Sequence, residues 1–146
     1  MRIPKFEAQT EWNIPTEFPD LRQVEEIAVD LETKDPDLKE KGSGSVIGNG
    51  DVIGIAVATN GFKGYFPIAH EGGGNMDRKK VLEWLKDILE APSTKVFHNA
   101  MYDVCWLRQL GFKINGDIVC TMIAAAITYE NRFRYDLNSF SWHYLG

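Results

Sequence analysis

The sequence predicts an α/β domain in which a mixed β-sheet is flanked by helices. Short apolar runs bounded by turn residues dominate residues 26–68 and indicate three strands, the last two joined as an antiparallel hairpin. Beyond residue 75 the apolar residues recur mostly at helical spacing, with one short strand between the first two helices. The predicted order is therefore β-β-β-α-β-α-α-α, in a chain of 146 residues.

Residues 1–23 are expected to form an extended N-terminal arm, because prolines interrupt a stretch whose apolar residues follow no period. The domain itself is expected to occupy residues 24–146. Its first strand covers residues 26–33 and is broken by Asp35-Pro36, since a residue before proline avoids regular helical geometry and starts a turn. A flexible loop rich in glycine, serine and lysine is expected over residues 39–45.

The next two strands form the predicted hairpin. Residues 51–59 contain a continuous apolar run, and residues 62–68 follow after Asn60-Gly61. An Asn-Gly pair between two apolar runs favours the tight turns that connect antiparallel strands. These two strands and the first are expected to be neighbours in one sheet.

The remaining elements are mostly helices. Asn75 is expected to cap the first, whose apolar residues at helical spacing are Val81, Leu82, Leu85, Ile88 and Leu89. A short strand at residues 95–98 follows, and then helices at residues 100–110, 118–128 and 136–145. The last helix is expected to turn its apolar side chains inward, namely Leu137, Phe140, Tyr144 and Leu145.

Composition excludes some classes of protein. The formal net charge of −5 argues against a protein that coats nucleic acid, because such domains are usually basic. The charge is compatible with an enzyme that approaches phosphates through metal ions. No apolar run reaches the roughly 18 residues of a membrane span, and the N-terminus lacks the apolar core of a signal peptide. We therefore expect a cytoplasmic protein with no membrane partner.

The first strand carries two carboxylates on one face. Side chains alternate along a strand, so Asp30 and Glu32 point away from the apolar side chains between them and lie about 7 Å apart. Two ionised carboxylates at the end of an apolar run repel each other and lose hydration. A bound cation is the simplest way to offset this cost.

Asp103 is the candidate third carboxylate. It lies four residues after Asn99 and four before Leu107, so on a helix it shares the apolar stripe and faces the sheet. Asp103 could converge on Asp30 and Glu32 to form a metal site. Carboxylate oxygens are hard ligands, which favour Mg²⁺ or Mn²⁺. Alternatively, backbone donors or Arg108 could satisfy it as a structural carboxylate.

These residues carry a resemblance to the DEDD superfamily of 3′–5′ exonucleases. Asp30-Leu31-Glu32-Thr33 resembles its first motif, Asp-x-Glu, and Asn99-Ala100-Met101-Tyr102-Asp103 resembles its second, Asn-x-x-x-Asp. The flanks are similar to the proofreading domain of family A DNA polymerases, and the arm and flanks are closest to the phage type. The flanking segments are residues 65–70, 117–122 and 135–140.

The resemblance implies an RNase H-like fold and a metal-dependent nuclease. Asp30, Glu32 and Asp103 would be the catalytic residues and would bind two divalent ions, Mg²⁺ or Mn²⁺. Thr33 and Asn99 would contact the terminal nucleotide by hydrogen bonds, and Tyr102 would lie near its sugar or base. The substrate would be a single-stranded 3′ end of DNA, and the partner a polymerase domain in a longer parent protein.

The chain departs from the family at the third motif, Tyr-x-x-x-Asp or His-x-x-x-Asp, which supplies a fourth acid. Neither pattern occurs in the sequence. In the family this motif follows the helix at which the sequence stops, so we expect a domain truncated before it, with slow cleavage or none.

Two other functions are compatible with the same residues. One is an incomplete, non-catalytic RNase H-like module that only binds single strands or braces a neighbouring polymerase. The other is a related 3′–5′ exonuclease that processes RNA.

Overall fold

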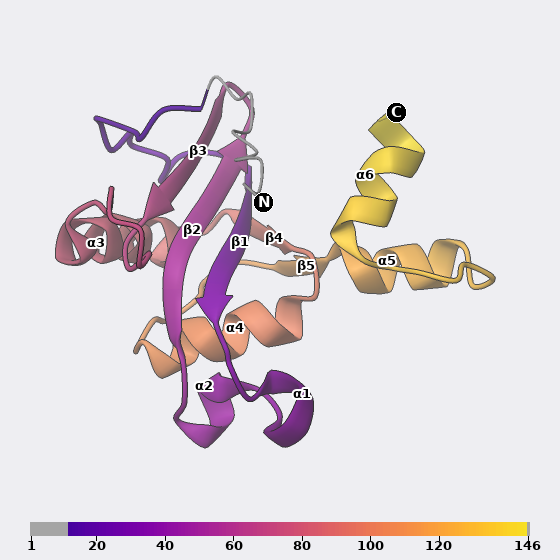
Figure 1. The fold of residues 1–146 in the computed structure, drawn as a ribbon. Coiled ribbons are helices and arrows are strands. Elements are labelled where there is room, and N and C mark those ends of the chain that lie inside the picture. Colours follow the sequence, from indigo (N-terminus) through magenta and orange to yellow (C-terminus); the bar gives the residue numbers. More distant parts are fainter. Residues whose placement is uncertain (1–11, 146) are drawn as a thin grey trace, which may run out of the picture.

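The computed structural model describes residues 12–145, which form a five-stranded mixed sheet with helices around it (Figure 1). The sheet order is β3-β2-β1-β4-β5, with β1 antiparallel to β2, β2 antiparallel to β3, and β4 parallel to both β1 and β5. The predicted α/β class is confirmed. The elements in chain order are β1 (Glu26–Lys34), α1 (Leu38–Lys41), α2 (Gly44–Ile47), β2 (Asp51–Thr59), β3 (Phe62–Pro67), α3 (Arg78–Glu90), β4 (Thr94–Phe97), α4 (Ala100–Gln109), β5 (Ile118–Cys120), α5 (Thr121–Thr128) and α6 (Leu137–Leu145).

Strand β1 has the alternation that the sequence predicts. Ile27, Val29 and Leu31 are buried, whereas Asp30 is half-buried and Glu32 is exposed on the other face. The apolar face of the sheet is covered by α3 and α4, and one hydrophobic core joins these helices to the strands. Burial of this face fixes the register of β1, because a slip of one residue would move its apolar side chains into water.

The cap of α3 differs from the prediction. The side chain of Asp77, not that of Asn75, accepts the hydrogen bond from the backbone N–H of Lys80 at 3.0 Å. The Asn75 side chain is engaged elsewhere, since it accepts from the backbone N–H of His70 at 2.7 Å and donates to the His70 carbonyl at 2.8 Å. Asn75 therefore closes the loop before α3 instead of starting the helix.

Two further boundaries were wrong. The segment expected to be a flexible loop at residues 39–45 contributes to two short helices, α1 and α2. The helix expected over residues 118–128 starts only at Thr121, because residues 118–120 pair with β4 as strand β5. The β-branched Ile118 and Val119 favour a strand, and the polar Thr121 interrupts the apolar run where the helix begins.

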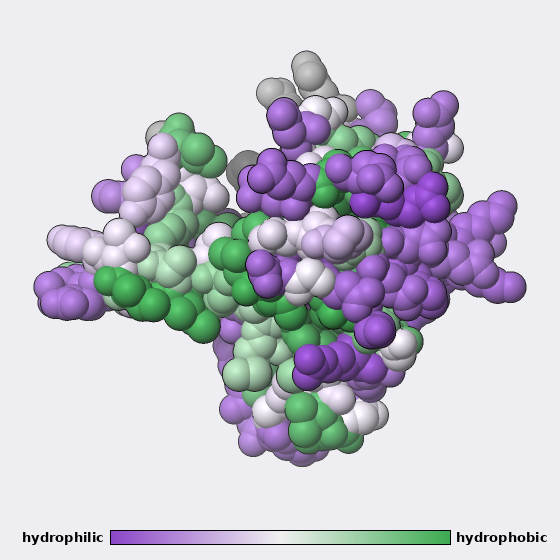
Figure 2. All heavy atoms as spheres, turned by 180° about the vertical axis from the view of Figure 1, so that it is seen from behind, coloured by the Kyte–Doolittle hydropathy of each residue, from purple (hydrophilic) through white to green (hydrophobic). Residues whose placement is uncertain are grey.

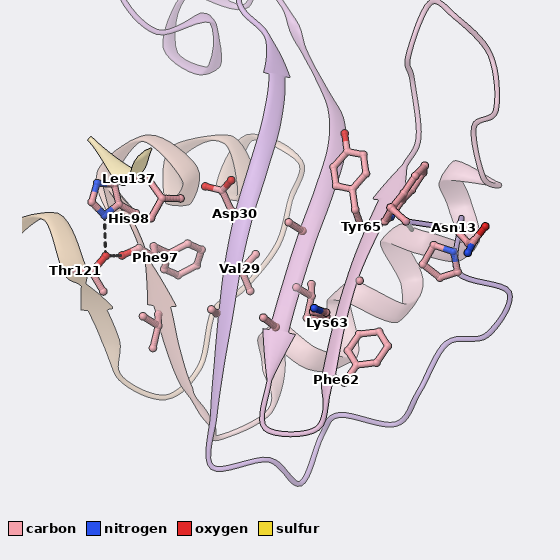
Figure 3. A pocket seen from close by; sticks show the side chains of 18 residues that line it. Asn13, Val29, Asp30, Phe62, Lys63, Tyr65, Phe97, His98, Thr121 and Leu137 are labelled. Atoms are coloured by element: carbon pink, nitrogen blue, oxygen red, sulfur yellow. Dashed lines mark hydrogen bonds between the residues drawn. The ribbon is translucent and has the colours of Figure 1, made fainter. Parts of the chain in front are cut away.

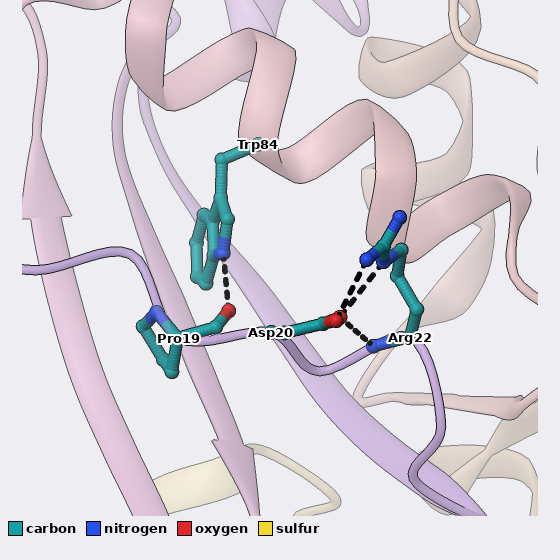
Figure 4. Close-up of polar contacts among 4 residues, drawn as sticks. All are labelled: Pro19, Asp20, Arg22 and Trp84. Carbon is teal, nitrogen blue, oxygen red and sulfur yellow. Dashed lines mark hydrogen bonds and ion pairs between the residues drawn. The ribbon is translucent and has the colours of Figure 1, made fainter.

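The N-terminal segment packs against the domain from residue 12 onward, and residues 1–11 of the expected arm lie outside the described part. Phe18 stacks on Phe66, and Leu21 is buried in the core. The indole N–H of Trp84 donates to the carbonyl of Pro19 at 2.8 Å, next to the exposed ion pair of Asp20 and Arg22 (Figure 4). The division at residue 23 stays a prediction.

Helices α5 and α6 extend away from the sheet (Figure 1) and leave apolar surface uncovered, which Figure 2 shows from behind. The inward orientation expected for α6 is wrong, because Leu137, Tyr144 and Leu145 are 46, 62 and 84% exposed. Only Phe140 is half-buried, with Arg132 over its ring at 4.4 Å. Among residues 12–145, the helices are too short or too polar to cross a membrane.

Candidate active site

The candidate site lies where β4 ends beside the middle of its parallel neighbour β1, just beyond the paired residues Ala28 and Val96. The sheet extends in opposite directions from this pair of strands. Strands β2 and β3 lie on the β1 side, and β5 lies on the β4 side. A reversal of this kind leaves a crevice at the carboxyl ends of the strands, where ligands bind in open α/β sheets. Asp30 and Glu32 lie on β1, and α4 begins directly after β4 with Asn99 and Asp103 in its first turns.

Asn99 makes the sharp turn from β4 into α4. It has φ 65° and ψ 53°, and among residues 12–145 it is the one non-glycine residue with a positive φ. Asparagine tolerates this left-handed conformation better than most residues, but a cost in backbone energy remains. Such conformations cluster at functional sites, where surrounding structure enforces them.

Asp103 reaches from α4 to the backbone of β1. Its side chain is nearly inaccessible, at 3% exposed, and Oδ1 accepts from the N–H of Leu31 at 3.3 Å. Leu31 separates Asp30 from Glu32, so Asp103 lies beside both of the other acids. The prediction that Asp103 faces the sheet is confirmed.

The acids perturb one another. Burial raises the pKa of Asp103 to about 7, and the negative charge of Asp30, more than that of Glu32, adds to the increase, while the bond from Leu31 opposes it. Burial also raises the pKa of Asp30, as does the charge of Glu32, while His98 lowers it. Asp30, Glu32 and Asp103 are therefore coupled through their charges.

The acids suit a divalent cation in their chemistry but do not form a ready-made cage. Among the described residues, no three Asp, Glu, His or Cys side chains are grouped closely enough to hold a metal ion. Mutual repulsion favours separation of the carboxylates, and a cation between them would reverse it. In their chemistry, hard oxygen donors of like charge fit Mg²⁺ or Mn²⁺.

Two of the residues expected to contact substrate are hydrogen-bonded to each other. The hydroxyl oxygens of Thr33 and Tyr102 are 2.8 Å apart, and the Tyr102 hydroxyl donates to Oδ2 of Asp35 at 2.9 Å. Both carboxylate oxygens of Asp35 also accept from the N–H of Gly44, at 3.1 and 3.0 Å. Sequence reasoning assigned Asp35 only to a turn before a proline and missed this role.

A groove of about 970 Å³ runs over the sheet face opposite the core (Figure 3). Asp30 lies within it, between Tyr65 on one side and His98 on the other. The Tyr65 hydroxyl is 2.5 Å from Nε2 of His70, and burial and the charge of Glu32 raise the pKa of this phenol. The groove therefore connects Asp30 to aromatic side chains and to Lys63.

The family model of the 3′–5′ exonuclease of A-type DNA polymerases matches residues 17–146. The chain belongs to this exonuclease family. The family membership predicted from the Asp-x-Glu and Asn-x-x-x-Asp motifs is confirmed. The matched range begins at residue 17, within the segment that was expected to be an N-terminal arm.

Two phage polymerases are similar to this exonuclease chain. A DNA-directed DNA polymerase of Pseudomonas phage M6 is 38% identical over 81 residues, which cover 53% of the chain and 12% of the polymerase. The DNA polymerase DpoZ of Acinetobacter phage SH-Ab 15497 is 28% identical over 130 residues, 88% of the chain and 18% of DpoZ. The chain thus spans less than a fifth of either relative.

A solved structure shares the fold. Brucella melitensis NrnC with bound Mg²⁺ superposes with a TM-score of 0.59 at 20% identity, covering 86% of this chain and 56% of NrnC. The RNase H-like exonuclease fold predicted from the motifs is confirmed. The roles of the individual site residues in the exonuclease chain remain predictions.

Proposed function

We propose that the chain is the proofreading domain of a phage DNA polymerase and hydrolyses phosphodiester bonds at single-stranded DNA 3′ ends. The observation that carries the proposal is the reach of Asp103 from α4 to the backbone between Asp30 and Glu32. Membership of the exonuclease family and the two phage polymerases support the activity and a polymerase domain as partner.

Asp30, Glu32 and Asp103 would hold two Mg²⁺ or Mn²⁺ ions. Such a pair supplies an activated water and stabilises the leaving 3′ oxygen of an in-line displacement. NrnC, which shares the fold, binds Mg²⁺. The raised pKa of Asp103 supports the same assignment, because burial and the neighbouring negative charges both oppose ionisation of this carboxyl, and a bound cation would offset them.

The other residues would position the 3′ end. The hydroxyls of Thr33 on β1 and Tyr102 on α4 lie together, and Asn99 forms the turn at the start of α4. The terminal nucleotide would contact all three. The groove continues from Asp30 to Lys63 and offers a path for the next nucleotides, with aromatic faces for stacking and an ammonium group for phosphate.

The test is cleavage of a 5′-labelled single-stranded oligodeoxynucleotide by the purified chain in Mn²⁺ or Mg²⁺. We expect slow, stepwise shortening from the 3′ end, because the sequence offers three acids and no Tyr/His-x-x-x-Asp. Asp103→Ala should abolish it, and the matched control Asp87→Ala, an exposed carboxylate on α3, should not. Metal-dependent cleavage that survives Asp103→Ala would contradict the proposal.

The substrate is tested in the same assay. Equal amounts of DNA and RNA of one sequence, mixed in one reaction, should lose the DNA faster. Preferential loss of the RNA would instead support an RNA-processing exonuclease, and binding of single strands without cleavage would support a non-catalytic module.

A further inference from the structure

The hydrogen bonds around Asp35 have a fixed direction. An ionised carboxylate only accepts, so the bond between Asp35 Oδ2 and the Tyr102 hydroxyl takes the single proton that this hydroxyl can donate. The 2.8 Å contact between Tyr102 and Thr33 then requires a proton from the Thr33 hydroxyl. Protons thus run from Thr33 to Tyr102 to Asp35, and Thr33 keeps only lone pairs to offer.

The carboxylate that sets this direction is itself held in place. The backbone N–H of Gly44 donates to both oxygens of Asp35. A side chain at residue 44 would not fit, since a Cβ there would lie 1.7 Å from the carbonyl oxygen of Asn49. The tight loop from β1 to β2 therefore fixes Asp35 against Tyr102.

A single-stranded DNA 3′ end carries few groups that suit an acceptor. Its phosphates only accept hydrogen bonds, and a site that does not read bases cannot rely on their amino groups. The sugar hydroxyl at the 3′ terminus can donate. The half-buried Thr33 lies directly after Glu32 on β1, where the terminal nucleotide is expected.

We propose that Asp35 is a positioning residue that orients the Tyr102 and Thr33 hydroxyls so that Thr33 accepts a hydrogen bond from the 3′-hydroxyl of the terminal nucleotide. This rests on the proposed exonuclease function and deepens it. Asp35 touches no substrate and acts through Tyr102. Its consequence is selection of ends with a free 3′-hydroxyl over ends without one.

The effect of Asp35→Asn follows from the same bonds. An asparagine amide can donate to the Tyr102 oxygen, which frees the Tyr102 proton to point at Thr33 and reverses the chain of donors. Thr33 would then offer a proton to the substrate in place of a lone pair. Because one net hydrogen bond contributes about 0.5–1.5 kcal/mol, we expect the wild type to prefer a 3′-hydroxyl by about two- to tenfold and Asp35→Asn to lose that preference.

The experiment compares the binding of two fluorescent five-nucleotide oligothymidylates to the 146-residue chain in millimolar Ca²⁺. One ends in a 3′-hydroxyl and the other is 3′-deoxy. The preference for the 3′-hydroxyl should vanish in Asp35→Asn, in Tyr102→Phe and in Thr33→Val. It should survive in Thr33→Ser. The double variant of residues 35 and 102 should lose no more of the preference than either single variant. Additive losses in the double variant, or an unchanged preference in Asp35→Asn, would overturn the proposal.

The matched control is Asp37→Asn. Asp37 is a second carboxylate of the same loop and accepts from Asn49 at 2.7 Å and from Lys41 at 3.1 Å, with no bond to Tyr102. Its replacement should leave the 3′-hydroxyl preference unchanged. A loss of preference equal to that of Asp35→Asn would mean that loop stability, not orientation of the hydroxyls, is responsible, and would overturn the proposal.

A second readout does not depend on substrate. Burial raises the pKa of the Tyr102 phenol, and the bond and charge of Asp35 add to the increase, while the bond from Thr33 lowers it. The Tyr102 pKa, followed by ¹³C NMR of labelled tyrosine, should therefore fall in Asp35→Asn but not in Asp37→Asn. An unmoved Tyr102 pKa would overturn the orienting role. Failure of the wild type to bind either oligonucleotide, with the expected fall in pKa present, would instead identify the exonuclease function as the mistaken premise.

Discussion

Replacing Asp103 with asparagine should stabilise the chain above neutral pH. Burial and the neighbouring acids raise the pKa of Asp103 from 3.8 to about 7 in the folded protein. Between these two pH values the folded state keeps a proton that the unfolded state has lost, so the free energy of unfolding falls as pH rises. By pH 8 this loss amounts to about 4 kcal/mol, at about 1.4 kcal/mol per pH unit.

Asparagine avoids the penalty because it is neutral at every pH and retains an oxygen that can accept from the Leu31 N–H. Asp103→Asn should therefore be more stable than the wild type by up to about 4 kcal/mol at pH 8, and nearly equal to it at pH 4. Urea unfolding with EDTA at pH 4, 6 and 8 measures both curves. A variant that is destabilised to the same extent at all three pH values would refute the reasoning, and Asp103 would then be an ordinary buried acceptor.

Further predictions concern the cation, the turn before α4 and the buried Lys95 of β4. Millimolar Mn²⁺ at pH 8 should raise the melting temperature of the wild type but not of Asp103→Asn, because only binding to the folded state stabilises it; equal shifts would argue for a different metal site. Asn99→Ala should lower the free energy of unfolding by about 1 kcal/mol, whereas Asn99→Gly should not, since glycine adopts a positive φ without strain; equal losses in urea unfolding would contradict this. Lys95→Met should cost at least about 2 kcal/mol in the same experiment, because the buried ammonium donates to the carbonyls of Ala91, Ser93 and Asn115, which would lose a partner; a cost below about 0.5 kcal/mol would show that water replaces it.

Much of the fold could be predicted because its signals are local and periodic. The alternation along β1, the Asn-Gly turn before β3 and the spacing in α3 each have one structural solution. Asp103 was predicted to face the sheet from its place on an apolar stripe, and it is buried there. The spacing of apolar residues therefore indicates which side chains are buried in the folded protein.

The failures share a different cause, which is competition from partners that the local sequence pattern does not reveal. Asparagine is a common helix-capping residue, but the Asn75 side chain forms hydrogen bonds with the backbone of His70. Asp77 caps the helix instead. Residues 118–120 form a strand because β4 offers an edge with which they pair.

The role of Asp35 was hidden in the same way. An Asp-Pro pair after a strand is an ordinary turn signal, and only the fold brings its carboxylate to Tyr102 and to Gly44. Both partners lie beyond the reach of a local pattern, at 67 and 9 residues along the chain. The motifs therefore pointed to the candidate metal-binding and substrate-contacting residues. They did not point to Asp35, which we propose orients the Tyr102 and Thr33 hydroxyls.

The central claim is that Asp30, Glu32 and Asp103 jointly bind the catalytic cations, and Mn²⁺ tests it directly. Paramagnetic Mn²⁺ broadens the NMR signals of nuclei near its binding site, so a titration of the ¹⁵N-labelled chain at pH 8 locates the ion. Broadening should begin at the backbone amides of residues 30–33 and 99–103, saturate with added Mn²⁺, and disappear in Asp103→Asn. Broadening that is confined to other acidic surfaces, or that persists unchanged in Asp103→Asn, would contradict the claim.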